Sequence, residues 1–299
     1  MSITSENKSL ILDSFSGIFK LQKEARNVAR SEAPHMGGIY SPVRLFGGQT
    51  AAQFQLAFRK LFSKLVVHTL KVNFIGPGNL KDPISYDFHR VPGTNFAIAN
   101  AVQNKKNIAT AKIRYGPSSD LLDQSPYFMP LIRNPLSYGS LRERLHFKDE
   151  FTQKLLRQFS VKSFIFDIRP VDFKQLTHMR NPFEPILLWC TLTSLHKKSR
   201  VPMDGPTVIS ILGDCMMVFN ARLQIMNLAK ITEFAAGASL NHTIWFHAME
   251  GIDPKGWFLY ETRCNRISNT NSVIEGRIFD EKGKCLMTVL QECYLKAKM

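Results

Sequence analysis

The sequence has none of the features that would place it across a membrane or in an export pathway. No run of about 18 consecutive apolar residues occurs, so neither a transmembrane helix nor membrane insertion is expected. The first residues lack the basic start and the apolar core of a secretory signal. They carry Glu6, Asp13 and Glu24, which fit poorly with an acid-poor mitochondrial transit peptide.

Motifs for metal binding and for a nucleophilic serine are also absent. Neither CxxC nor HExxH spacing occurs, so no metal site is expected. A GxSxG motif is missing too, which argues against a serine hydrolase of the nucleophile-elbow kind. Cysteine is sparse and mostly set among apolar residues, which indicates reduced thiols packed in a core. These residues are Cys190, Cys215, Cys264, Cys285 and Cys293.

Acidic residues are few compared with basic ones, and the formal net charge is +15. Such a charge is compatible with nucleic acid, an anionic membrane face or a small ligand that carries phosphate. The sequence has no aromatic-rich RNP-type motif, so a nucleic-acid role would rest on charge alone. No nucleic-acid partner is therefore expected.

An internal repeat organises the chain. In the first half, a helix is expected from Phe46 to about Leu65, followed by strands at 68–74, 84–90, 95–103 and 108–115. The second half repeats this order, with an apolar helix from Val208 to about Leu223 and strands at 242–248, 257–266, 272–279 and 285–294. His68 and His242 begin corresponding strands 174 positions apart, and the turns at 104–107 and 281–284 lie 177 apart. This nearly constant offset indicates two copies of one helix-plus-sheet unit.

A long helix wrapped by an antiparallel meander is the hotdog arrangement, so the predicted fold is α+β, a double hotdog. The two sheets are expected to pair edge to edge into one continuous sheet, because their edges would otherwise stay open. The predicted domains are an N-terminal unit at 1–118 and a C-terminal unit at 161–299. Residues 119–160, which include Pro126, Pro130 and Pro135, are predicted to be a linker with a helix from Phe147 to Phe159.

Three short motifs then connect the chain to a known family. They are Leu45-Phe46-Gly47-Gly48-Gln49, Asn241-His242-Thr243-Ile244-Trp245-Phe246-His247 and Thr288-Val289-Leu290-Gln291-Glu292. From about Arg44 to Tyr294 the chain resembles the type II acyl-CoA thioesterases, both bacterial thioesterase B-like and peroxisomal. The resemblance implies hydrolysis of fatty acyl-CoA to a free fatty acid and CoA. It also implies a homo-oligomer and no cofactor, since CoA is part of the substrate.

The same resemblance implies a catalytic set. In that family a water is activated by an Asp on the second helix, a Ser or Thr before the His-containing strand, and a Gln on the last strand. Those motif positions hold Asp214, Ser239 and Gln291. Asp214 is the only charge between Val208 and Phe219, so its burial would raise its pKa towards the range of a general base. The alternative is that Asp214 lies on a narrow exposed face of its helix.

Gln291 and Ser239 each have a second interpretation. Gln291 is the single polar member of an alternating apolar stripe, where its amide would either orient a water or be satisfied by backbone groups. The other members of that stripe are Cys285, Met287, Val289 and Cys293. Ser239 is expected at the mouth of a strand after Gly237-Ala238, where a serine taken alone is an ordinary loop residue.

Gly47 and Gly48 are expected at a helix N-terminus, where backbone N–H groups would face the developing oxyanion. Glycine there would let the substrate approach the backbone closely, or would simply form a tight turn into the helix. His242 and His247 are an odd number of residues apart on one strand, so they should point to opposite faces. Both are left outside the predicted catalytic set.

Two rival functions follow from departures and partial matches. Ser210 to Asp214 resembles part of a hotdog hydratase signature, but that signature needs a histidine where this sequence has Phe219. A catalytically silent acyl-CoA-binding hotdog protein is the second rival. Asn241 stands where the family commonly has Asp, and the helix of the first copy has no acidic counterpart of Asp214. One active centre per chain is therefore expected, with the first copy non-catalytic.

The C-terminal tripeptide Ala297-Lys298-Met299 is similar to the Ser-Lys-Leu peroxisomal address. It predicts recognition by a peroxisomal import receptor and a location in the peroxisomal matrix. The alternative is a frayed, Lys-rich tail on a cytoplasmic protein.

Overall fold

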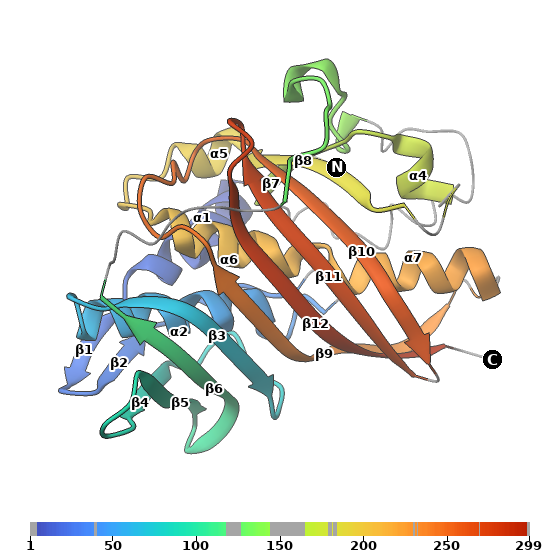
Figure 1. Cartoon of the computed structure of the whole chain (residues 1–299). Helices are drawn as coiled ribbons and strands as arrows, with labels where there is room; N and C mark the ends of the chain where they lie inside the picture. Colours follow the sequence, from blue (N-terminus) through green and yellow to red (C-terminus); the bar gives the residue numbers. More distant parts are fainter. Residues whose placement is uncertain are drawn as a thin grey trace.

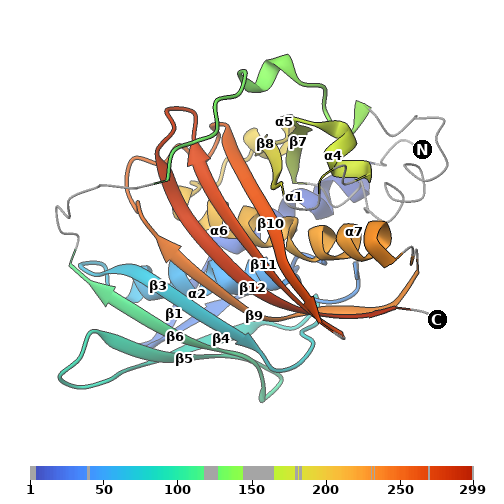
Figure 2. The same ribbon diagram turned by 45° about the vertical axis from the view of Figure 1, so that its right-hand side comes forward.

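The computed structural model describes residues 5–38, 41–117, 127–143, 165–178, 181, 184–229, 231, 233–268 and 270–297. Within these residues, twelve antiparallel strands form one sheet that curves around a layer of helices (Figures 1 and 2). This arrangement confirms the predicted α+β double hotdog with one continuous sheet.

The sheet repeats the same connectivity twice. The first unit has the order β1 (Gln22–Ala25), β2 (Val28–Ser31), β4 (Ile84–Arg90), β5 (Phe96–Gln103), β6 (Lys106–Gly116) and β3 (Val66–Phe74). The second unit has the order β7 (Phe166–Pro170), β8 (Ile186–Leu192), β10 (Phe258–Ser268), β11 (Asn271–Asp280), β12 (Cys285–Ala297) and β9 (Phe234–Phe246). The two units join where β3 pairs with β9.

Helices fill the concave side of the sheet. The central pair is α2 (Gly47–Leu61) and α6 (Gly205–Cys215), which pack on each other, while α7 (Met217–Ala229) packs against β10 and β11. Around them lie α1 (Ser5–Phe19), α4 (Phe173–His178), α5 (Ser194–Lys197) and the 3-10 helix η1 (Pro135–Ser137). All eleven residues of α6 are buried, as expected for an apolar helix enclosed by a sheet.

The register of the seam corrects the predicted equivalence between the copies. The β3–β9 ladder runs from Thr69 opposite Trp245 to Asn73 opposite Asn241, with Lys71 opposite Thr243 at its centre. A symmetric ladder therefore relates positions 172 apart, rather than the 174 inferred from the two histidines. The structural counterpart of His242 is Leu70 and not His68.

Several element boundaries also differ from the prediction. The expected helix from Val208 to Leu223 is two helices that meet at Met216, because α7 turns away to cover the second half of the sheet. Strand β9 begins at Phe234, eight residues before the predicted start, so Ser239 lies within a strand and not at its mouth. Strands β1, β2, β7 and β8 were not predicted. The predicted helix from Phe147 to Phe159 and the domain limits at 118 and 161 lie outside the described residues.

The run Gly205–Leu228 is long and apolar enough to cross a membrane by length and composition. Most of it is buried inside the protein, between the helices and the sheet, as in the core helix of a globular fold. This run is interrupted by Asn220, Arg222 and Gln224, which is why the sequence shows no continuous apolar stretch of that length.

We predict that the seam is a major source of stability. Ile244 is fully buried at the β3–β9 ladder, so Ile244→Ala should lower the free energy of unfolding by about 2–5 kcal/mol. Ile98→Ala, at a half-exposed position of β5, should cost less than about 1 kcal/mol. Urea unfolding followed by circular dichroism measures both, and equal losses would show that the seam has no special weight.

Candidate active site

Asp214 lies on α6 with only 6% of its surface exposed. Its Oδ1 atom has no hydrogen-bond partner within the described part of the chain. Burial raises the pKa of this carboxyl. The pKa is lowered in part by His242, by hydrogen bonds from Gln291 and Ser239, and by the backbone N–H of Gly48. The structure thus excludes the exposed-face alternative, because the carboxyl is buried among donors from three other elements.

Gln291 and Ser239 lie side by side next to this carboxyl. Nε2 of Gln291, on β12, donates to Oγ of Ser239, on β9, at 2.8 Å. Met287, Val289 and Cys293 of the predicted stripe lie in the main core, and Gln291 itself is completely buried. Cys285 does not belong to this stripe, because a bulge at Leu286 places it in a separate cluster with Trp189, Leu259 and Phe279. The three residues of the predicted catalytic set therefore come together from one helix and two neighbouring strands.

A β-bulge explains how Ser239 reaches this position. Opposite β12, Asn241 pairs with Glu292 and Ser239 pairs with the next residue, Cys293, so Leu240 is an extra residue in β9. Residues 239 and 242 would face opposite sides of a regular strand, but the bulge turns both towards the core. Without it, Ser239 would point away from Asp214.

The N-terminus of α2 completes the site from the first unit. The helix begins after Phe46, whose side chain forms no cap hydrogen bond, and the backbone N–H of Gly48 donates to Asp214 instead. A Cβ on Gly47 would lie 3.2 Å from Oδ2 of Asp214, and one on Gly48 would lie 2.5 Å from the Phe46 ring. Glycine therefore suits both positions because the helix end closely approaches Asp214 and Phe46, and its predicted role in substrate approach stays a prediction.

The related position in the other unit is closed. At the N-terminus of α6, the Asp204 side chain accepts from the backbone N–H of Thr207, which caps the helix. Arg59 of α2 forms an ion pair with Asp204 at 2.9 Å, and Gln55 donates to the Thr207 hydroxyl at 2.6 Å. At this helix end of the second unit, α2 of the first unit thus contributes Arg59 and Gln55, where α6 contributes the acid Asp214 to the end of α2.

In the first copy, the strand positions that correspond to the candidate site hold apolar residues. Strand β3 carries a bulge at His68, which matches the bulge at Leu240, so that Val67, Leu70 and Ile113 occupy the places of Ser239, His242 and Gln291. All three are fully buried. Among the described residues, the polar constellation is therefore built once per chain.

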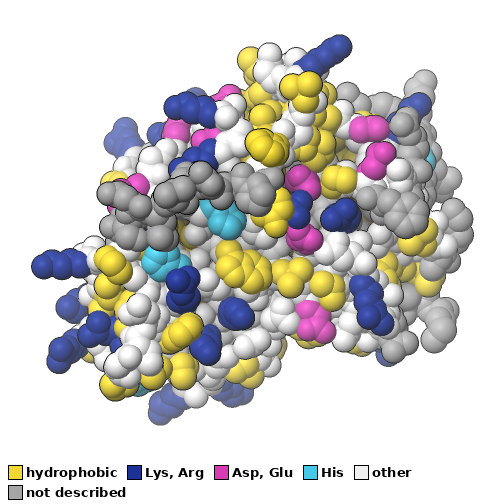
Figure 3. All heavy atoms as spheres, in the orientation of Figure 1, with side chains coloured by type: hydrophobic (Ala, Val, Ile, Leu, Met, Phe, Trp, Pro, Cys, Tyr) yellow, Lys and Arg dark blue, Asp and Glu magenta, His cyan; other side chains and the backbone are white. Residues whose placement is uncertain are grey.

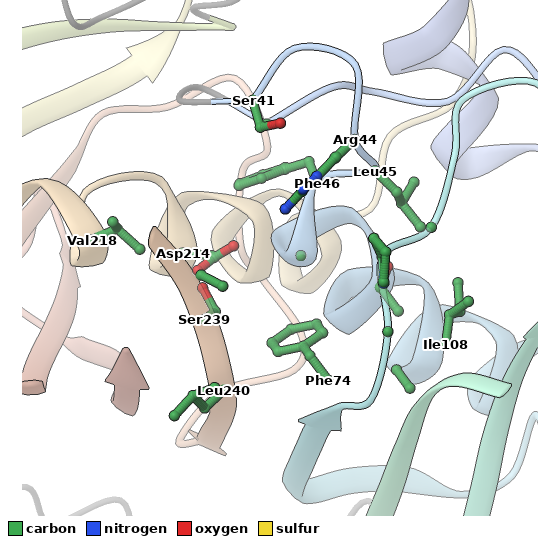
Figure 4. Close-up of a pocket in the computed structure, with 18 of the residues that line it drawn as sticks. Ser41, Arg44, Leu45, Phe46, Phe74, Ile108, Asp214, Val218, Ser239 and Leu240 are labelled. Atoms are coloured by element: carbon green, nitrogen blue, oxygen red, sulfur yellow. The ribbon is translucent and has the colours of Figure 1, made fainter. Parts of the chain in front are cut away.

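A cavity of about 360 Å³ opens onto the site. Figure 4 shows Asp214 and Ser239 next to each other in its wall, with Phe46 and Phe74 on either side. Its walls come from both units, with Arg44, Leu45 and Ile108 from the first and Val218 and Leu240 from the second. The volume and the largely apolar lining suit a small organic ligand with an aliphatic part.

Known proteins share this architecture and part of its sequence. Residues 169–295 match the family model of the acyl-CoA thioesterase C-terminal domain. The second unit is therefore similar to an acyl-CoA thioesterase domain, within a chain that folds as a double hotdog. The chain is 25% identical over 266 residues to acyl-coenzyme A thioesterase 8 of Homo sapiens, which covers 85% of this chain and 81% of that protein.

Two further comparisons cover almost the whole chain. It is 24% identical to acyl-CoA thioesterase 2 of Haemophilus influenzae, over 94% of this chain and 96% of that one. An acyl-CoA thioesterase II structure from Mycobacterium marinum superposes with a TM-score of 0.69 at 19% identity, over 96% of this chain and 98% of that one. The last comparison shows that the double-hotdog fold is shared from end to end.

His242 also belongs to this site, although the sequence did not predict it. It is completely buried, and its Nδ1 lies 2.6 Å from Oε1 of Gln291. His247 faces outwards and contacts the Thr288 hydroxyl, so the predicted opposition of the two histidines is confirmed. Position parity showed that one of them faces the core, but it did not show which one meets the glutamine.

The departures noted in the sequence lie outside the constellation. Asn241 points to the other face of β9, where it donates to Glu292 at 2.8 Å. A carboxylate at this position would face Glu292 directly, so the amide is the better partner. Phe219, where a hydratase would need its histidine, is buried on α7.

The five cysteines are buried and unbridged, as predicted. Burial raises the pKa of the Cys215 thiol, the one in the cavity wall, so it stays protonated and unreactive. No group of three or more metal-ligating side chains occurs among the described residues.

We predict that Asp214 destabilises the fold at neutral pH. The pKa of Asp214 is higher in the folded protein than in the unfolded chain, where it is about 3.9. The neutral carboxyl therefore stabilises the fold fully below about pH 3.9, and this stabilisation is lost as the pH rises through the pKa of the folded protein. Asp214→Asn should therefore raise the melting temperature at pH 7, and the gain should shrink towards pH 4. Thermal unfolding across this range tests the prediction, and a variant less stable at every pH would contradict it.

Proposed function

We propose that this chain hydrolyses fatty acyl-CoA to a free fatty acid and CoA, with a water activated by Asp214 and positioned by Ser239 and Gln291. The class of reaction is that of its relatives, which are acyl-CoA thioesterases. The assignment of roles rests on one observation. The buried Asp214 carboxyl, with Oδ1 unpartnered within the described residues, lies between an uncapped helix N-terminus and the Ser239–Gln291 pair at a cavity wall.

The geometry suits attack by water on a thioester. Asp214 accepts a proton from the water while the water oxygen forms a bond to the thioester carbonyl carbon. The negative charge on the carbonyl oxygen is stabilised by the positive N-terminal end of α2, where Gly47 and Gly48 let the substrate approach the backbone closely. The carbon–sulfur bond then breaks, and the proton held by Asp214 passes to the thiolate of CoA. No cofactor enters this sequence of steps.

The cavity supports an acyl-CoA substrate at both ends. Phe46, Phe74, Val218 and Leu240 offer apolar surface for the acyl chain. The phosphates of CoA would be attracted by Arg44 in the cavity wall and by the excess of basic residues. Figure 3 shows Lys and Arg side chains gathered over the strands of the first unit.

The proposal predicts a specific loss of turnover. Wild type should release CoA thiol from a panel of acyl-CoAs of increasing chain length, and Asp214→Asn should lower kcat by about a hundredfold or more, because the general base is lost. Asp253→Asn, in an exposed turn, is the matched control and should keep full activity. Thiol release is followed with a colorimetric thiol reagent.

The outcome also separates the enzyme from a silent acyl-CoA-binding protein. Binding of acyl-CoA by wild type, measured by calorimetry without any thiol release, would reject the thioesterase proposal and favour the silent module. Full activity of Asp214→Asn would leave the reaction in place and reject the role of Asp214.

A pH dependence follows from the buried carboxyl. Asp214 works as a base only when ionised, and burial raises its pKa. Therefore kcat/KM should fall on the acid side with a midpoint above the ordinary aspartate value of about 3.9. Rates at pH 4 to 9 in one buffer series measure this midpoint. Constant activity down to pH 4 would show that no buried acid controls the reaction.

The C-terminal end of the chain bears on where the protein is located. Strand β12 is hydrogen-bonded to β9 as far as Ala297, and Lys298 and Met299 lie outside the described residues. We propose that Ala297-Lys298-Met299 directs the chain to the peroxisomal matrix through the import receptor. Fluorescent fusions with and without the last three residues test this, and an unchanged cytoplasmic signal would reject it. Light scattering of the purified chain tests the predicted homo-oligomer.

A further inference from the structure

His242 is a buried titratable group that the proposed hydrolysis does not use. It lies on β9 with no exposed surface. In the ladder between β9 and β12 it is directly opposite Gln291. Its Nδ1 is 2.6 Å from Oε1 of Gln291. Its Nε2 faces α6, where a Cβ on Gly213 would lie 3.9 Å away, and has no hydrogen-bond partner among the described residues.

The contacts of Gln291 determine which nitrogen of His242 carries the proton. Nε2 of Gln291 donates to Ser239 at 2.8 Å and lies 3.2 Å from the sulfur of Cys293. The Asp214 carboxyl also accepts from Gln291, so the amide nitrogen faces acceptors, and Oε1 is left towards His242 as an acceptor. A carbonyl oxygen needs a donor, so Nδ1 of His242 must carry the hydrogen.

The orientation of this amide decides what the Ser239 hydroxyl can do. Because Oγ of Ser239 accepts from Gln291, its own hydrogen remains free for Asp214, whose carboxylate can only accept. If the amide were reversed, Oε1 would face Ser239 and would attract the hydroxyl hydrogen away from Asp214. The reversed amide would then need an acceptor at Nδ1 of His242, which is the opposite tautomer.

We propose that His242 is a positioning residue that holds the Gln291 amide, through a proton on Nδ1, in the orientation that directs the Ser239 hydroxyl to Asp214 and its water. The inference rests on the proposed function and extends it by one residue. It also places a chain of three hydrogen bonds in a fixed direction, from His242 to Gln291, from Gln291 to Ser239 and from Ser239 to Asp214.

The first copy supports the view that these residues act as a unit. At the matching bulge and ladder positions, Ser239, Gln291 and His242 are all replaced together by Val67, Ile113 and Leu70. A histidine that only packed against the helix would have no reason to be present in the polar copy and absent from the apolar one. Leu70 also shows that leucine is accommodated at the same place in the fold.

The first experiment compares His242→Leu with His242→Asn. Leucine offers no donor to Gln291, so kcat should fall about tenfold or more with KM little changed, because the amide loses its fixed orientation. Asparagine can place an N–H group near the Nδ1 position, so it should keep kcat within about threefold of wild type. The acid-side midpoint of kcat/KM should move to higher pH in His242→Leu, since the hydrogen bonds from Gln291 and Ser239 that lower the pKa of Asp214 lose their fixed geometry.

A double-mutant cycle with Gln291→Met separates positioning from packing. If His242 acts through the amide, its loss should have almost no further effect on kcat once Gln291 is methionine. Additive losses from the two substitutions, or an unchanged kcat and pH profile in a folded His242→Leu, would overturn the inference. Circular dichroism and melting temperature confirm that each variant is folded.

Imidazole nitrogen NMR tests the inference independently of activity. At pH 7 the ¹⁵N shifts of His242, assigned by the signal missing in His242→Asn, should show hydrogen on Nδ1 and a lone pair on Nε2. The Nε2–H tautomer would overturn the positioning role even in an active enzyme. The Nδ1–H tautomer in a chain that releases no CoA would support the network while rejecting the proposed hydrolysis.

Discussion

The pairing of β3 with β9 is the interaction on which the rest of the structure depends. Each unit has one sheet edge that would be open if the unit folded alone, and each covers the edge of the other. This seam brings α2 and α6 into contact inside the common curve of the sheet. The approach of the two helices then carries the N-terminus of α2 to Asp214. The candidate site is thus a result of how the units join, and neither unit contains it alone.

The N-termini of α2 and α6 at this interface are neutralised in different ways. A free helix N-terminus attracts negative charge, and the protein satisfies that attraction in two ways. At α6 the charge is Asp204, which is held in place by Arg59. At α2 the charge is Asp214 from the neighbouring helix, which leaves the helix end open to a cavity. The same pair of helices therefore forms an ion-paired contact on one side and lines the candidate site on the other.

Much of this arrangement was predictable from the sequence, for physical reasons that differ between residues. The alternation of Met287, Val289 and Cys293 indicated that Gln291 faces the core, and an isolated Asp214 in an apolar helix suggested a buried acid. The repeat of helix and strands indicated the double hotdog. The bulge at Leu240 was not predictable, because an extra residue leaves no mark in an alternating pattern, and with it the true position of Ser239 was lost. His68 and His242 look alike in sequence, yet only the ladder shows that Leu70 is the true counterpart.

The covalent connection between the units has a consequence for how such a site can diverge. In an assembly of two identical hotdog chains, every substitution appears on both sides of the symmetry axis, so a residue that benefits one centre must be tolerated in the other. In a tandem chain the two sides are separate stretches of sequence. Val67, Leu70 and Ile113 can therefore be core residues while their counterparts Ser239, His242 and Gln291 are polar. The first half thus contributes apolar scaffold around the single candidate site of the described residues.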